Sequence, residues 1–262
     1  MQVHQLLKRG ENHKDFCEDF LIAFDLSERY SIYGVFDGCS SGMESHFASA
    51  LMAKVFRAEL QYLEPDTYDN TKEALSRALL HGIESIASIR DNLLLETEEL
   101  LSTIILFLVD RIEMSGDIIA IGDGYISING ENHKIDQNNE PDYLAYYLDQ
   151  INTYEDFEKW MLSHAIQYHV SKVDDITIST DGILSFQKLK NGDFEHNAPY
   201  PLDYLIRDEY LFENKAMLSR KCNILRTKYG FAHLDDLGII RIKNNSQKSK
   251  QNGTIESNYA EG

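Results

Sequence analysis

Short apolar runs, several of them alternating with polar residues, open the chain and predict β-strands. Three such runs lie at residues 2–8, 20–26 and 30–36, and the polar segments between them predict hairpin-like links. Apolar residues then recur at helical spacing across residues 41–63 and again across residues 69–94. This change of period predicts two long helices directly after the first strands.

The second half of the chain repeats the change from strands to helices. Four short apolar runs separated by glycine-containing turns predict an antiparallel meander that forms a second sheet, at residues 102–109, 117–122, 125–129 and 133–136. Residues 138–156 are polar and rich in tyrosine, which predicts an excursion from this sheet. The remaining predicted elements are a helix at residues 154–164, strands at 165–170 and 175–179, helices at 201–212 and 214–229, and a final strand at 237–242.

This order of elements predicts an α+β fold, in which two antiparallel sheets face each other between outer layers of helices. A single domain is the simplest interpretation of a chain of 262 residues without an evident internal repeat. We expect it to span residues 1–243. The polar, Lys- and Asn-rich remainder at residues 244–262 is predicted to be a disordered tail.

Composition and charge narrow the class of protein. With 43% hydrophobic and 11% aromatic residues the composition is globular. No apolar run approaches the roughly 20 residues of a membrane-spanning helix, and neither end resembles a signal peptide, so we expect a cytoplasmic protein without a membrane partner. The formal net charge of −18 also disfavours nucleic acid as a partner. The 3 widely spaced cysteines predict reduced thiols, because they fit neither a disulfide framework nor a zinc site.

Acidic motifs beside strand-like runs supply the candidate chemistry. They contain Asp19, Asp37, Asp181 and Asp235. Strand ends could carry these carboxylates into one cleft, where like charges resist ionising together unless hard cations neutralise them. Asp-Gly is also a common turn sequence, so each motif by itself is explained as a plain turn. The position of three Asp-Gly pairs directly after apolar strands favours a divalent metal site.

The order of these motifs resembles that of the metal-dependent type 2C protein serine/threonine phosphatases, the PPM family, in its bacterial form. The Arg-x-x-Asn-Glu-Asp element of the family resembles residues 14–19, and its Asp-Gly-x-Gly-Gly element resembles residues 37–42. Further similar elements are Leu101-Ser102-Thr103, Gly122-Asp123-Gly124, Thr180-Asp181-Gly182 and Asp235-Asp236. The resemblance covers nearly the whole chain before the tail.

The resemblance implies a four-layer αββα sandwich with Mg²⁺ or Mn²⁺ in the cleft between its sheets, as two ions or, in many bacterial members, three. The implied metal ligands are Asp19, Asp37, the carbonyl of Gly38, Asp123, Asp181 and Asp235. The implied catalytic residues are Glu18, which supports a metal-bound water, Asp37, which contacts two ions, and Lys14, which contacts phosphate. The implied activity is hydrolysis of phosphoserine and phosphothreonine in phosphorylated proteins by a metal-bound hydroxide. Carboxylate and carbonyl oxygens are ligands that suit these hard ions.

Several residues depart from the family pattern. Lys14 replaces an Arg and offers a point charge in place of a bidentate fork; a solvated surface role is the alternative. Cys39 stands where many eukaryotic members carry a His proposed as general acid, and it is either a passive thiol or a site of redox control. His46 is a candidate for the general acid or a structural residue. Asp236 and Gly238 replace an Asn and a Thr without removing an implied ligand.

Two other functions stay open at this point. A catalytically weak or inactive member could keep the sandwich and act by binding a partner protein, which the changes at Lys14 and Cys39 motivate. Another two-metal hydrolase, such as a nuclease, is disfavoured by the acidic charge and the absence of a basic groove. Residues 138–156 occupy the position of the flap of bacterial members without resembling its sequence, so an ordinary surface excursion is the alternative there.

Overall fold

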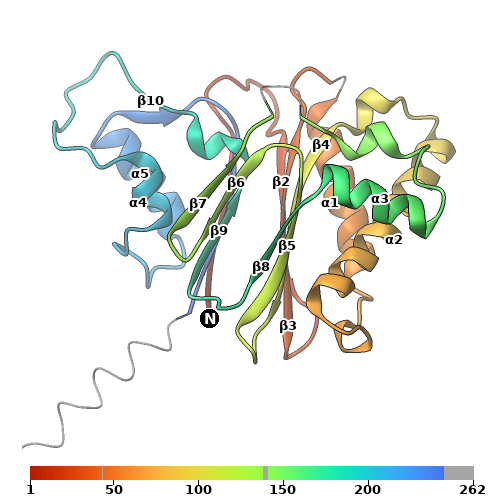
Figure 1. Ribbon diagram of the computed structural model, residues 1–262. Helices are drawn as coiled ribbons and strands as arrows, with labels where there is room; N and C mark the ends of the chain where they lie inside the picture. The colour runs from red at the N-terminus through yellow and green to blue at the C-terminus, as the bar shows by residue number, and fades with distance from the viewer. Residues whose placement is uncertain (43, 138–140, 245–262) are drawn as a thin grey trace, which may run out of the picture.

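Two five-stranded antiparallel sheets lie face to face in the computed structural model, which describes residues 1–42, 44–137 and 141–244 (Figure 1). The first sheet has the order β2 (Asp19–Asp25), β3 (Tyr30–Gly38), β4 (Ser102–Asp110), β5 (Ser115–Ile121) and β8 (Ile166–Val170). The second sheet has the order β1 (Gln2–Lys8), β12 (Leu237–Lys243), β9 (Asp175–Ser179), β6 (Gly124–Ile128) and β7 (Glu131–Ile135). A separate ribbon pairs β10 (Phe186–Lys188) with β11 (Phe231–His233).

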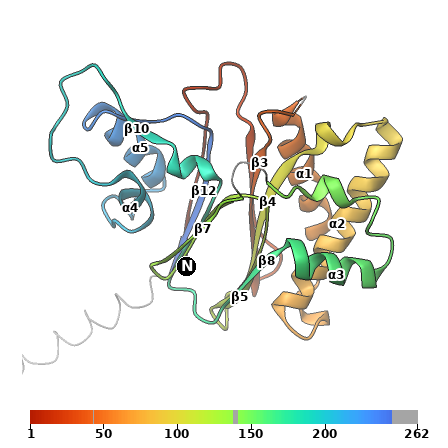
Figure 2. The same cartoon turned by 45° about the horizontal axis from the view of Figure 1, so that its top comes forward.

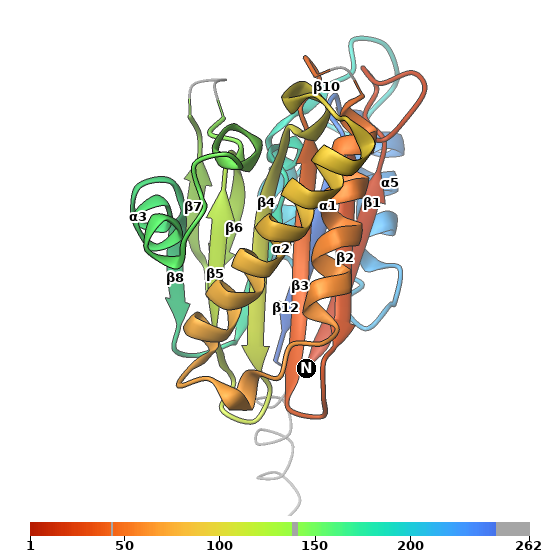
Figure 3. The ribbon, with the colours of Figure 1, turned by 90° about the vertical axis from the view of Figure 1, so that its right-hand side faces the viewer.

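Helices cover the outer face of each sheet and complete four layers (Figure 2). The first sheet carries α1 (Ser45–Leu60), α2 (Thr71–Leu93) and α3 (Tyr154–His164). Figure 3 shows α1 lying over β2 and β3, α2 crossing β4 and β5, and α3 beside β8. The second sheet carries α4 (Pro201–Ile206) and α5 (Met217–Thr227). The α+β class and the αββα sandwich are confirmed.

Strand β4 shows why the sandwich forms, because all 9 of its residues are buried. Its even-numbered apolar residues, such as Leu106, pack toward the helices of the first layer, whereas its odd-numbered ones, such as Phe107, pack toward the second sheet. Successive side chains of a strand point to opposite faces, so a strand that is apolar throughout needs a cover on both sides. Burying a side chain of this size contributes about 2 to 3 kcal/mol.

Two predicted strand pairings are wrong. Strand β1 does not form a hairpin with β2; it pairs in the other sheet with β12, where Leu6 lies opposite Ile239. The predicted meander is divided, because β4 and β5 belong to the first sheet and β6 and β7 to the second. The chain passes between the sheets at Gly122, whose φ of +78° is a left-handed conformation that favours glycine. Alternating apolar residues predict where strands lie but carry no information about their partners.

Other differences are smaller. Helix α4 ends at Ile206, before the predicted residue 212, and the short strands β10 and β11 were not predicted. The predicted excursion contains a 3-10 turn at Leu144–Tyr147, and its residues 138–140 lie outside the described residues. So do residues 245–262 of the predicted tail, which stays a prediction, as does the domain boundary. Among the described residues, no helix combines the length and the hydropathy needed to cross a bilayer.

Candidate metal centre

Four aspartates lie at one end of the sandwich, where strands of the two sheets begin or end. Asp19 opens β2 directly opposite Asp37, near the end of β3. In the second sheet Asp181 follows β9, and Asp235 lies just before β12. Because β9 and β12 run antiparallel, with Ser179 opposite Ile239, these two aspartates reach the same edge. The structure therefore brings together carboxylates that are separated by more than 200 residues of sequence.

Asp19 is the most revealing of these side chains. It is 2% exposed, and its Oδ2 accepts a hydrogen bond of 2.7 Å from Thr180 Oγ1. Its Oδ1 has no hydrogen-bond donor among the described residues. Burial, and after it the charges of Asp236 and Asp235, raise the pKa of Asp19 to about 8, although the Thr180 hydroxyl and Asp37 favour the charged form. A buried carboxylate oxygen without a donor is unfavourable by about 1 to 3 kcal/mol, and a cation would satisfy it.

Asp37 and Asp181 share this environment. Burial and the charges of Asp19, Asp181 and Asp235 raise the pKa of Asp37, and burial and the charge of Asp235 raise the pKa of Asp181. Asp37 in its protonated form has one O–H, which can donate to either Asp19 or Asp181. In the described part of the chain, no three His, Cys, Asp or Glu side chains form a ready coordination shell. The composition and charge of this aspartate group fit hard divalent cations.

Asp123 lies at the rim of the group. Its Oδ1 accepts a hydrogen bond of 2.9 Å from the backbone N–H of Gln137, and its charge acts on Asp181. Burial raises the pKa of Asp123, and the charge of Asp136 adds to the effect, while Lys134 opposes it. Asp123 is thus near enough for its charge to act on Asp181.

Glu18 and Gly38 are joined through the backbone. The N–H of Gly38 donates to the Glu18 carbonyl at 2.9 Å, and the Glu18 side chain accepts from Ser40 Oγ at 2.7 Å. A Cβ at position 38 would overlap the carbonyl of Ser45, so only glycine fits between β3 and α1. This packing holds the segment after Asp37 against the Glu18 loop.

His13 is a member of the site that sequence reasoning missed. Its Nδ1 lies 2.8 Å from Asp236 Oδ2, and its Nε2 lies 3.5 Å from Asp235 Oδ1 and 3.8 Å from Glu18 Oε2. Burial acts to lower the pKa of His13, but the hydrogen bond to Asp236 and the three negative charges outweigh it, so the pKa is raised. The only sequence signal was its position in the loop that leads to Asp19. A protonated His13 would neutralise part of the acidic group.

Asp236 has a structural task. Its Oδ1 accepts from the Gly10 N–H at 2.6 Å, and its Oδ2 accepts from the N–H of Glu18. Asp236 therefore fastens both ends of the loop at residues 10–18, in which His13 lies. The expectation that the change from Asn to Asp at this position removes no metal ligand stays a prediction.

Lys14 and His46 are not drawn into the carboxylate group. Lys14 is exposed, its carbonyl accepts a hydrogen bond of 2.6 Å from Arg9 Nη1, and its ammonium forms no ion pair with the described carboxylates. His46, in the first turn of α1, stacks on Phe16 with ring centroids 4.1 Å apart. Neither contact assigns a catalytic role to these residues.

A family model described as protein phosphatase 2C matches residues 8–211. The chain belongs to the protein phosphatase 2C family. The match includes Asp19, Asp37, Asp123 and Asp181, whereas Asp235 lies beyond it. No curated protein sequence matches this chain.

Solved structures of protein phosphatase 2C type share the fold at low sequence identity. A bacterial serine phosphatase variant has a TM-score of 0.61 at 12% identity, over 94% of this chain and 99% of that chain. The catalytic domain of the phosphatase PstP, solved with two manganese ions, has a TM-score of 0.52 at 14% identity, over 92% and 96% of the two chains. RsbX, solved with magnesium, has a TM-score of 0.50 at 16% identity, over 91% and 92%. At such identities these likenesses show the fold.

A cavity of about 580 Å³ in this protein phosphatase 2C chain is lined in part by Cys39, which follows Asp37 by two residues. The Cys39 thiol lies 3.1 Å from Ser41 Oγ, and Tyr143 is another residue of the cavity wall. Burial acts to raise the pKa of Cys39, but hydrogen bonds from Ser41, Tyr143 and the N–H of Gly42 outweigh it and lower the pKa. The residue that replaces the general-acid His of other members is thus already hydrogen-bonded.

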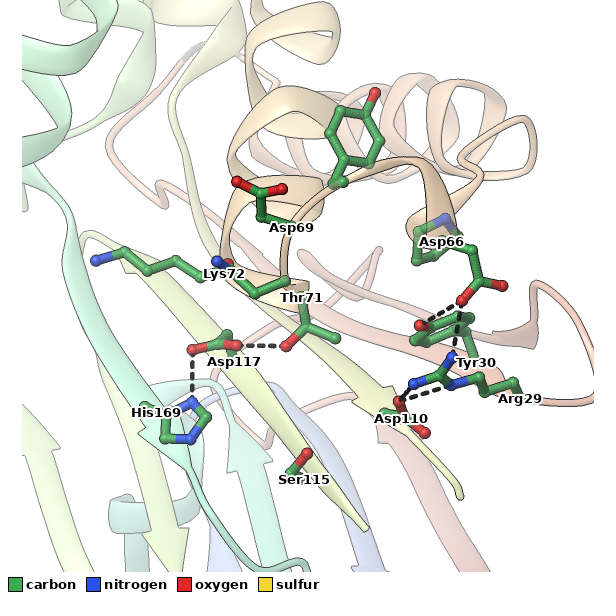
Figure 4. A pocket seen from close by; sticks show the side chains of 13 residues that line it. Arg29, Tyr30, Asp66, Asp69, Thr71, Lys72, Asp110, Ser115, Asp117 and His169 are labelled. Atoms are coloured by element: carbon green, nitrogen blue, oxygen red, sulfur yellow. Dashed lines mark hydrogen bonds and ion pairs between the residues drawn. The ribbon is translucent and has the colours of Figure 1, made fainter. Parts of the chain in front are cut away.

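A cavity of about 560 Å³ lies at the other end of the first sheet, near the start of β3 (Figure 4). Its charged groups largely satisfy one another. Arg29 pairs with Asp110 at 2.6 Å and with Asp66 at 2.9 Å, and Asp117 accepts from Thr71 at 2.5 Å. Nδ1 of the exposed His169 lies 3.0 Å from Asp117. We interpret these ion pairs and hydrogen bonds as structural contacts that hold α2 and the segment before it against the first sheet.

Proposed function

We propose that this protein is a metal-dependent protein phosphatase that hydrolyses phosphoserine and phosphothreonine in other proteins. The observation that carries the proposal is the group formed by the buried Asp19 and the half-buried Asp37 and Asp181, which have raised pKa values and include a carboxylate oxygen without a donor among the described residues. Such a group is stable as a set of anions only when cations bind to it. Because the chain belongs to the protein phosphatase 2C family, the function proposed for these cations is hydrolysis of phosphate esters.

Mg²⁺ or Mn²⁺ would be held by the carboxylates that converge from both sheets. One ion would take Asp37, Asp181 and Asp235, and a second would take Asp37, the Gly38 carbonyl and Asp19. Asp123 with Asp181 would serve a third. When bound, the ions supply an acidified water for attack on phosphorus and positive charge for the phosphoryl oxygens.

The chain's own residues orient these groups. Thr180 fixes Asp19 through its hydroxyl, which also accepts from the N–H of Gly238 at 3.1 Å. Glu18, held by Ser40, would accept a proton from a water at the site. Lys14 is exposed and has no partner among the described carboxylates, so its ammonium would be free to contact phosphate at the mouth of the site.

The test is hydrolysis of p-nitrophenyl phosphate and of a phosphothreonine peptide by metal-stripped protein, with Mn²⁺ or Mg²⁺ restored. We expect turnover only with metal, and a loss of about 100-fold or more in Asp181→Asn. Calorimetric titration with Mn²⁺ gives a second readout that is independent of activity. Asp193→Asn, a change at an exposed aspartate outside the site, is the matched control and should behave as wild type.

Three results would contradict the proposal. Turnover without metal, or full turnover in Asp181→Asn, would remove the metal assignment. Folded, Mn²⁺-loaded protein that hydrolyses neither substrate would favour the rival function, a phosphatase-fold module that acts by binding a partner protein.

A further inference from the structure

The cavity of about 580 Å³ has two wall residues that are tied to candidate metal ligands, Cys39 through the chain and Gln137 through a hydrogen bond. On one side Cys39 follows Asp37 by two residues, and its N–H donates to the carbonyl of Leu101 at 3.0 Å. On the other side the backbone N–H of Gln137 donates to Asp123 at 2.9 Å. A phosphorylated residue held at the carboxylates would therefore place a neighbouring side chain at this cavity.

The outer wall of the cavity is held in place by burial and by hydrogen bonds. Tyr143 is 6% exposed and packs in the buried cluster between the first sheet and its helices. Asp142, the next wall residue, accepts from the Tyr147 hydroxyl at 2.5 Å and lies 2.5 Å from His164 Nδ1. Its N–H donates to Gln137 Oε1 at 2.6 Å. The wall is thus fastened to α3 on one side and to the Asp123 loop on the other.

The chemistry of the cavity favours a cation with an apolar stem. Leu101, Pro141 and two tyrosine rings supply apolar and aromatic surface, and Tyr146 is 49% exposed. Burial raises the pKa of Tyr146, and the carboxylates of Glu98 and Asp142 add to the effect. No Lys or Arg is among the described residues that line the cavity. An acidic side chain would be repelled here, whereas Lys or Arg would contact aromatic rings and a carboxylate.

We propose that this cavity, walled by Cys39, Leu101, Pro141, Asp142, Tyr143 and Tyr146, binds the side chain next to the phosphorylated residue and selects Lys or Arg there. The inference rests on the proposed phosphatase function and names the substrate class, phosphoproteins with a basic residue beside the phosphorylated one. It also gives the segment at residues 141–147 a role in recognition, where the sequence alone left an ordinary surface excursion open.

The experiment compares phosphothreonine peptides that carry Lys, norleucine or Glu on either side of the phosphothreonine, with Mn²⁺ present. Norleucine keeps the stem of Lys without its charge. We expect kcat/KM to be about 5-fold higher for Lys than for norleucine on one side, as one exposed cation–π contact implies, and lowest for Glu. Turnover of p-nitrophenyl phosphate, which has no such side chain, normalises each variant for folding and metal loading.

Two variants distinguish the contribution of the Tyr146 ring from that of its hydroxyl. Tyr146→Phe should keep the preference for Lys, and Tyr146→Leu should reduce it to nearly 1. Tyr62→Leu, a change at an exposed tyrosine outside the cavity, should leave the preference unchanged. A preference for norleucine or Glu in wild type, or a preference for Lys that survives Tyr146→Leu, would overturn the proposal.

Failure of the phosphatase function is distinguishable from failure of this inference. If wild type hydrolyses nothing, fluorescence anisotropy of the same labelled peptides measures the cavity directly. Tighter binding of the Lys peptide that is lost in Tyr146→Leu would support the cavity assignment without catalysis, and equal binding of all three peptides would refute it.

Discussion

Replacing Asp19 with Asn should stabilise the metal-free protein at neutral pH. Asp19 is buried and its pKa is about 8 in the folded protein, against about 3.9 in an unfolded chain. A carboxyl with a raised folded pKa binds more protons in the folded state. The stability that it contributes is therefore complete below its unfolded pKa and is lost as the pH rises toward 8. Asn has a similar shape, carries no charge and can still accept the hydroxyl of Thr180.

The size of the effect follows from the pH range between the pKa of Asp19 in the unfolded chain and its pKa in the folded protein. Each pH unit changes the free energy of unfolding by at most about 1.4 kcal/mol for one group, so wild type can lose up to about 3 kcal/mol relative to the variant between pH 5 and pH 7. Asp37 and Asp181 also have raised pKa values and titrate together with Asp19, which spreads the loss over a wider range. We expect a difference of about 1 to 3 kcal/mol at pH 7 and a smaller one at pH 5.

Urea unfolding in EDTA at pH 5, 6 and 7 measures this difference. Trp160, the 1 tryptophan of the chain, is buried in α3 and reports unfolding by its fluorescence. Comparison of the variant with wild type cancels the titration of groups that the two proteins share. With Mn²⁺ at about 100 times its Kd, wild type should gain about 2.7 kcal/mol, which offsets most or all of this difference, because wild type keeps the complete ligand set.

Asp110→Asn is the matched control, since Asp110 is a second buried aspartate with the opposite shift. Burial acts to raise the pKa of Asp110, but hydrogen bonds from Arg29 and from the N–H groups of Glu113 and Ile112 outweigh it and lower the pKa. This variant should be less stable than wild type at pH 7. The reasoning is refuted if Asp19→Asn is also less stable at pH 7 in EDTA, or if its difference from wild type does not change with pH.

Three further predictions concern groups that support the site and the fold. Thr180→Val removes the hydroxyl bonded to Asp19, so Mn²⁺ affinity measured by calorimetry should fall by about 10-fold, and an unchanged affinity would count against this contact. Gly182→Ala would force a Cβ onto the carbonyl of Asp236, so we expect lost Mn²⁺ binding or insoluble protein, whereas wild-type affinity would show that the backbone can yield. Lys221→Met leaves backbone carbonyls under α4 without their buried donor and should lower the free energy of unfolding by about 1 to 3 kcal/mol in urea; no loss would show that water replaces the ammonium.

Local patterns in the sequence determined most of the elements. The predicted helix at residues 154–164 and the strands at 2–8 and 175–179 have the observed bounds of α3, β1 and β9. These patterns are reliable because a strand or helix repeats its apolar positions over a few neighbouring residues, and the helix start at Thr153 is also marked by a local capping box. The acidic motifs were found in the same way, as aspartates at the ends of apolar runs.

Strand pairing was decided by the tertiary structure alone. Strand β4 is apolar at every position from 104 to 109, so its sequence does not distinguish the face that meets α1 and α2 from the face that meets the second sheet. Similarly, β1 could bury its apolar positions against any neighbouring strand, and it pairs with β12 from the far end of the chain. A periodic pattern of apolar residues indicates that one face of a strand is buried. The rest of the fold determines which element covers that face.

The residues of the candidate site also divide into those that the sequence indicated and those that only the tertiary structure revealed. The sequence by itself determined which carboxylates are candidates, because their motifs resemble a known family. Only the tertiary structure placed His13 against Asp235 and Asp236, left an Asp19 oxygen without a donor, and set the Tyr143 segment beside Cys39. Charge interactions and desolvation depend on distances through space and on what covers a group, and neither quantity is written in the order of residues along the chain.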